Sequence, residues 1–138
     1  MNMGSHAPLI AVVSQDRDEA EMYATTLPLL GFRVASVLAN VATEALALID
    51  RVRPGGVLIR IPPDTLGIDL IHGIRRHGRL RDTPIVMIAS VADEDVHDAA
   101  RAGGADLLFV APTAPDTIAA AFDRLLSERS ARNDREQR

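Results

Sequence analysis

The sequence predicts a single α/β domain built on a parallel β-sheet, and three observations support this prediction. Its 138 residues match the length of one domain. Hydrophobic residues make up 47% and charged residues 25%, as in folded globular proteins, which excludes wholesale disorder. Short β-branched runs alternate five times with helix-like segments. This alternation is typical of parallel strands joined by right-handed crossovers, with helices on both faces of the sheet.

The five expected strands are short and mostly apolar. The first run, Leu9–Val13, is too short for an amphipathic surface helix and is uniformly apolar. This pattern predicts a central strand that is buried on both faces. The expected strands span residues 9–13, 32–38, 56–61, 85–89 and 107–110.

Capping and stop signals predict the helices. Asp16 followed by Glu19 predicts a capping box before a helix over residues 17–30, which should end or kink near Thr26 because Pro28 follows. Asn40 is the expected N-cap of the next helix. The remaining expected helices span residues 41–53, a segment after a loop at 62–67 with Ile68, Ile71 and Ile74 on one side, 92–102, and 114–126.

The ends of the chain differ in composition from the middle. The apolar helical spacing stops at Leu126, and Glu128 with Arg132 supports at most a frayed helical extension. The chain is therefore expected to divide into residues 1–7, a disordered leader or added residues; residues 8–126, the folded domain; and residues 127–138, a polar tail or linker.

Composition excludes several classes of protein. No apolar run approaches the ~18 residues of a membrane span, and no signal-peptide pattern precedes the domain, so we expect a cytoplasmic protein without a membrane partner. The absence of Cys excludes disulfides and thiolate metal sites. A net charge of −4 argues against a nucleic-acid partner. All 15 cationic residues are Arg, so the chain has no Lys.

The residues that follow each strand are the candidate functional site. In open parallel sheets, ligands bind outside the carboxyl ends of the strands, near the switch in strand order. The candidate site residues are Ser14, Gln15, Arg60, Ala89, Ser90, Ala111 and Pro112.

Four segments carry a resemblance to a known family: Ile10–Val13, Pro54–Ile59, Thr83–Ile88 and Gly104–Leu108. Together with Pro112, they resemble the CheY-like response-regulator receiver domain of two-component signalling over residues 8–126. The resemblance implies a doubly wound, flavodoxin-like sheet in the order 2-1-3-4-5. It also makes Ala111–Pro112 a candidate cis peptide bond.

The family transfers a phosphoryl group to an aspartate at the end of the third strand. Two acidic residues hold Mg²⁺, and a hydroxyl and a Lys contact the phosphoryl group. In this sequence, the resemblance places Arg60 at the phosphoacceptor and Ser14 and Gln15 at the acidic pair. It places Ala89, with Ser90 beside it, at the hydroxyl position, and Ala111 at the Lys position. The phosphorylation site is therefore predicted to be dismantled.

Two alternatives stand for Arg60. Its guanidinium either reaches solvent or is tied to Asp16, Asp64, Ser14 or Gln15, or it binds a phosphate or a partner's carboxylate. The first is favoured because no Gly-rich phosphate loop accompanies the arginine. Asp64 lies four residues beyond Arg60, which is too far along the expected loop to replace the phosphoacceptor.

The remaining patterns predict no cofactor, no metal and no enzyme. The histidines (His6, His72, His77 and His97) lack ligand spacing, and no Gly-rich turn follows the first strand. Ser14 has no identifiable His–acid pair for nucleophilic catalysis. The Arg79–Asp82 spacing, which binds a cyclic dinucleotide in some diguanylate cyclases, is expected to be a chance match.

By resemblance, the expected function is a phosphorylation-independent pseudo-receiver that acts as a protein-interaction or dimerisation module. Its partner would be another protein, an attached output domain or a second copy. The alternatives are a ligand-sensing module that binds a small anion or nucleotide near Arg60, and a conventional receiver in a different alignment. The expected interaction face contains Val96, Ala99, Ala100, Leu108, Ala119 and Ala120.

Overall fold

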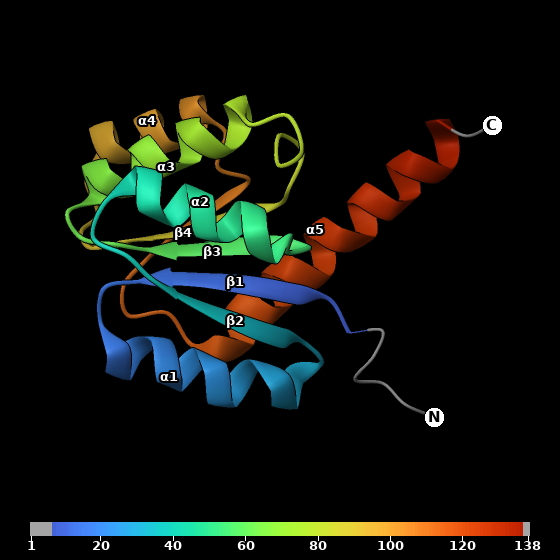
Figure 1. The fold of residues 1–138 in the computed structure, drawn as a ribbon, viewed down its shortest axis with the longest axis horizontal. Coiled ribbons are helices and arrows are strands. Elements are labelled where there is room, and N and C mark those ends of the chain that lie inside the picture. The colour runs from blue at the N-terminus through green and yellow to red at the C-terminus, as the bar shows by residue number, and fades with distance from the viewer. Residues whose placement is uncertain (1–6, 137–138) are drawn as a thin grey trace.

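The computed structural model describes residues 7–136 and contains a five-stranded parallel sheet. The strand order is β2-β1-β3-β4-β5, which confirms the predicted doubly wound topology (Figure 1). The strands are β1 (Leu9–Ser14), β2 (Arg33–Leu38), β3 (Gly56–Arg60), β4 (Ile85–Ala89) and β5 (Leu107–Val110). The helices are α1 (Arg17–Thr26), η1 (a 3₁₀ turn, Leu27–Leu30), α2 (Ala42–Val52), α3 (Asp64–Arg76), α4 (Glu94–Gly103) and α5 (Pro115–Glu136).

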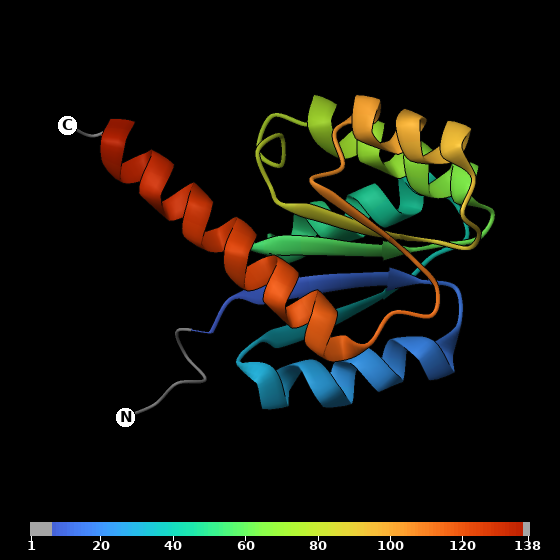
Figure 2. The same cartoon turned by 180° about the vertical axis from the view of Figure 1, so that it is seen from behind.

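Helices cover both faces of the sheet. Figures 1 and 2 show α2, α3 and α4 on one face and α1 with α5 on the other. Side chains alternate along a strand, so β1 contributes Ala11 and Val13 to the core under α2 and α3, and Ile10 and Val12 to the core under α1 and α5. This two-sided burial explains the uniformly apolar sequence of the central strands.

The first helix begins at the predicted N-cap, Asp16, but one hydrogen bond of the predicted capping box is missing. Asp16 caps α1 by accepting the backbone N–H groups of Asp18 and Glu19. The reciprocal bond of a capping box is absent, because the backbone N–H of Asp16 donates to Ser14 Oγ and the Glu19 side chain pairs elsewhere. The α-helical part ends at Thr26, as Pro28 predicts.

Two predicted helix boundaries are wrong. Asn40 does not cap α2, since Val41 occupies that position without a side-chain hydrogen bond. The expected loop over residues 62–67 is helical from Asp64 onward. Gly67 lies inside α3, where a Cβ atom would approach Met87 Cε to 3.1 Å. This glycine therefore allows close packing of the helix on the sheet and does not mark a loop.

The last helix is longer than predicted. It continues ten residues past 126 to Glu136, and Figure 2 shows its end projecting from the body of the domain. Its side chains beyond Leu126 are mostly exposed, and an Arg124–Glu128 ion pair at i,i+4 supports it in place of the expected Glu128–Arg132 pair. The predicted leader lies outside the described residues, except for residue 7.

Candidate functional site

The carboxyl ends of the strands bring the predicted site residues to one edge of the sheet. Ser14 is paired in register with Arg60 across β1 and β3, and β4 and β5 end at Ala89 and Val110 beside them. The peptide bond between Ala111 and Pro112 is cis, as predicted, and so is the bond between Pro62 and Pro63. A pocket of about 460 Å³ lies at this edge and is lined by Ser14, Gln15, Asp16, Arg17, Glu19, Arg60 and Pro62.

The two side chains at the predicted acidic pair have no charge to offer a metal. Ser14 is buried, and its hydroxyl accepts the backbone N–H of Asp16 at 3.0 Å and donates to the backbone oxygen of Asp16 at 3.2 Å. Gln15 is exposed. The local turn therefore uses the Ser14 hydroxyl to position the start of α1.

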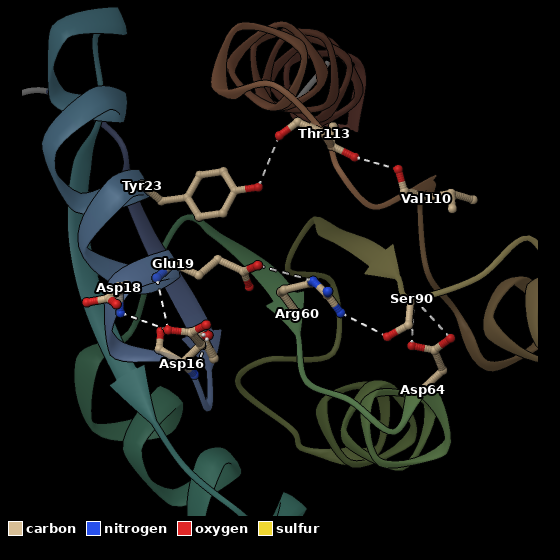
Figure 3. A network of polar contacts seen from close by, with 10 residues as sticks. Asp16, Asp18, Glu19, Tyr23, Arg60, Asp64, Ser90, Val110 and Thr113 are labelled. Carbon is tan, nitrogen blue, oxygen red and sulfur yellow. Dashed lines mark hydrogen bonds and ion pairs between the residues drawn. The ribbon is translucent and has the colours of Figure 1, made fainter.

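Arg60 has partners that the sequence did not predict. Its Nη1 donates a hydrogen bond to Ser90 Oγ at 3.0 Å, and its Nε lies 3.4 Å from Glu19 Oε2 (Figure 3). The second contact is an ion pair without hydrogen-bond geometry, because Nε is buried and has no hydrogen-bond partner. The side chains of Arg60 and Glu19 are only 17% and 28% exposed. The guanidinium thus bridges α1 and the loop after β4.

Asp64 lies close to Arg60 and Ser90, although its place in the expected loop did not indicate a contact with Ser90. It is 9% exposed, and both of its carboxylate oxygens accept the backbone N–H of Ser90, at 2.9 and 3.1 Å (Figure 3). It is the first residue of α3, which begins earlier than predicted. Because Ser90 also receives the Arg60 hydrogen bond, its backbone and side chain are each held by a charged group.

Tyr23 extends this network to the start of α5. Its hydroxyl donates to the backbone oxygen of Thr113 at 3.2 Å, and Thr113 Oγ1 donates to the backbone oxygen of Val110. Burial raises the pKa of Tyr23 above its ordinary value of 10.0, and the negative charge of Glu19 raises it further. The positive charge of Arg60 acts in the opposite direction and lowers this pKa.

None of the residues that the resemblance aligns with the phosphorylation site has an acidic side chain. A guanidinium neither ligates a metal nor acts as a nucleophile. The nearby carboxylates already have partners, since Asp16 caps α1, Glu19 pairs with Arg60 and Asp64 binds Ser90. Within residues 7–136, no three His, Asp or Glu side chains form a group that could hold a metal ion.

The predicted interaction face is only partly at the surface. Ala99 and Ala120 are exposed, and Val96 and Leu108 are half-buried. Ala100 and Ala119 are 0% and 5% exposed, because each points toward the sheet and packs in one of the two cores. These two alanines cannot contact a partner, so their assignment to the face was wrong.

Comparison with known proteins identifies the fold. No family model matches the sequence, and no curated protein matches it. A CheY-like receiver domain protein from Methanospirillum hungatei JF-1 matches with a TM-score of 0.80 and 20% identity, over 91% of this chain and 98% of that chain. The receiver domain of a signal transduction histidine kinase from Syntrophus aciditrophicus matches with a TM-score of 0.75 and 22% identity, over 88% and 92%.

A longer protein also contains this fold. NtrX from Brucella abortus matches with a TM-score of 0.78 and 25% identity over 96% of this chain, but over only 29% of its own length. The chain therefore has the CheY-like receiver fold, which in these structures occurs both as a separate domain and as part of a larger protein. None of the helices in the described part of the chain has the length and apolar character needed to cross a membrane.

Proposed function

We propose that this chain is a phosphorylation-independent pseudo-receiver that acts as a protein-interaction or dimerisation module in signalling. The observation that carries the proposal is the position of Arg60. It stands at the end of β3, where the receiver family has its phosphoacceptor, and its guanidinium is bound by Glu19 and Ser90. A bound cation at this position opposes Mg²⁺ and supplies no nucleophile.

The polar network supports a constant conformation of the loop after β4. In the receiver family, a hydroxyl after this strand contacts the phosphoryl group. Here, the Ser90 hydroxyl accepts a hydrogen bond from Arg60, and the Ser90 backbone donates to Asp64. Both contacts come from the protein itself, so the loop needs no phosphoryl group to hold it. Binding by such a module depends on partner concentration.

A second copy of the chain is the partner that the surface best fits. A largely apolar groove of about 550 Å³ lies between β5 and α5, and its lining includes Leu107 and Phe109. On its α5 wall, Asp116 and Arg124 lie four residues before and four residues after the exposed Ala120. A twofold axis at Ala120 would place two α5 helices antiparallel, with the Asp116 of each copy opposite the Arg124 of the other.

The pocket beside Arg60 favours a second candidate function, a sensor of a small anion or nucleotide. Its volume of about 460 Å³ accommodates a small ligand. Its charged lining is balanced, however, with Asp16 and Glu19 against Arg17 and Arg60. Arg60 is also already paired within the protein, so an anion would have to displace Glu19. The interaction module is therefore the better-supported proposal.

An NMR titration of the labelled protein tests the proposal directly. Mg²⁺ with beryllofluoride, a stable mimic of the acyl phosphate, is added first, and Mg²⁺ with acetyl phosphate follows. We expect no saturable shifts at Ser14, Arg60 or Ala111, while a conventional receiver titrated in parallel responds. Saturable shifts at these residues that spread to residues 92–120 would identify a working phosphoswitch and overturn the proposal.

A further inference from the structure

A hollow of about 570 Å³ lies at the opposite end of the sheet from the candidate site. It is bounded by the last turns of α5, the loop between α3 and β4, and the loop between α4 and β5. We call it the basal hollow. Its lining residues are Arg75, Arg81, Asp82, Gly104, Ala105, Asp106, Arg129, Arg132, Asn133 and Glu136.

Arg75 builds a fixed wall of the basal hollow. Its Nε and Nη2 donate to the backbone oxygen of Gly104, and its Nη1 donates to the backbone oxygens of Arg81 and Thr83. Its Nη2 also pairs with Asp106 at 2.9 Å, and the same carboxylate oxygen accepts the backbone N–H of Ile85 at 2.7 Å. All five guanidinium donors are thus used, and the charge of Asp106 is neutralised.

Three other arginines line the basal hollow with their donors unused. The guanidinium groups of Arg81, Arg129 and Arg132 form no ion pair or hydrogen bond among residues 7–136. Arg129 and Arg132 lie three residues apart on one face of α5, and Arg81 lies on the loop across the hollow. These three cations face two carboxylates, Asp82 and Glu136, so the hollow is positive in a chain of net charge −4.

We infer that the basal hollow binds a small molecule carrying a diphosphate group, held by Arg81, Arg129 and Arg132. Each planar guanidinium can donate two parallel hydrogen bonds to a phosphate. The three arginines come from two separate elements, the loop before β4 and α5, and a diphosphate offers them more acceptor oxygens than a single phosphate does. The concave shape and the volume suit a small ligand. This inference is independent of the proposed function, since it uses none of the residues at the Arg60 site.

Isothermal titration calorimetry with inorganic pyrophosphate, at constant ionic strength and without divalent metal, tests the inference. Four proteins are compared: the full chain, Arg129→Gln with Arg132→Gln, Arg81→Gln on the opposite wall, and Arg51→Gln as the matched control. Arg51 is exposed at the end of α2 and does not line the basal hollow. Circular dichroism checks that each variant is folded.

We expect saturable binding at one site, a dissociation constant at least tenfold higher in both hollow variants, and an unchanged constant in the control. Orthophosphate should bind at least tenfold more weakly than pyrophosphate. Tighter binding of ADP would extend the ligand to nucleoside diphosphates, and equal binding would restrict recognition to the diphosphate. Absence of saturable binding, or an equal loss of affinity in Arg51→Gln, would overturn the inference.

Discussion

Both carboxylate oxygens of Asp64 accept the backbone N–H of Ser90, although the two residues lie 26 positions apart in the chain. This contact ties the first turn of α3 to the loop that follows β4. Ser90 in turn accepts a hydrogen bond from Arg60, which pairs with Glu19 on α1. The edge of the sheet where receivers are phosphorylated is therefore held together here by the chain's own charged side chains.

Replacing the Asp64 side chain should destabilise the fold. In Asp64→Ala, the N–H of Ser90 loses its acceptor, and an unsatisfied donor of this kind costs about 1–3 kcal/mol. We expect the free energy of unfolding in urea to fall by this amount. Asp69→Ala is the control, because Asp69 is exposed on the same helix. Equal effects of the two substitutions would show that the contact contributes nothing specific.

Tyr23 should report on the charges beside it. It is the only tyrosine, and the chain has no Lys and no Cys, so its hydroxyl is the one side chain expected to titrate between about pH 9 and 12. The ultraviolet absorbance of tyrosinate should give a pKa above 10.0. Because Glu19 raises this pKa and Arg60 lowers it, Glu19→Gln should decrease it and Arg60→Gln should increase it. Shifts in the reverse directions would refute the arrangement in Figure 3.

The same pKa shift has a consequence for stability. A raised pKa in the folded state means that the unfolded chain releases the Tyr23 proton first as the pH rises. The contribution of Tyr23 to the free energy of unfolding is therefore fully present below pH 10. It is lost as the pH rises through the pKa of Tyr23 in the folded state. Urea denaturation over this range should show the loss, and Tyr23→Phe should remove the tyrosine's part of it.

Reversing the charge at Arg60 should create a dependence on divalent metal. In Arg60→Asp, the introduced carboxylate faces Glu19, and Ser90 loses a charged hydrogen-bond donor worth about 1.5–3 kcal/mol. We expect a lower melting temperature that millimolar Mg²⁺ partly restores, because oxygen ligands of like charge favour a hard cation. Arg60→Gln is the matched control and should not respond to Mg²⁺. An equal rise in both variants would indicate a general salt effect.

A charge exchange on α5 tests the proposed dimer. Asp116→Arg and Arg124→Asp should each raise the dimer dissociation constant in sedimentation experiments, because each places like charges opposite one another across the twofold axis. The double variant restores opposite pairs and should recover association. Loss of the intramolecular Arg124–Glu128 pair should affect monomer stability by about 0–1 kcal/mol only, since both side chains are exposed. A chain that remains monomeric at all concentrations would exclude this mode.

Local signals in the sequence predicted the strands and most helix boundaries, and the family resemblance implied the strand order. The errors occurred where tertiary packing changes the meaning of a residue. Glycine is typical of loops, but Gly67 lies inside α3, where the missing side chain lets the helix approach Met87 closely. Residues after Leu126 carry no core pattern, yet they continue α5 to Glu136, and the Arg124–Glu128 pair supports the start of this extension.

The identity of the side chains at the strand ends was determined by the sequence alone. Arg60, Ser14, Gln15 and Ala111 are the residues that the resemblance aligns with the phosphorylation site, and their chemistry follows from their type. Only the tertiary structure decided which charges meet. Glu19 reaches Arg60 across 41 positions of the chain, and Asp64 reaches Ser90 across 26. Such pairs depend on how helices are placed over the sheet, and sequence spacing does not encode that placement.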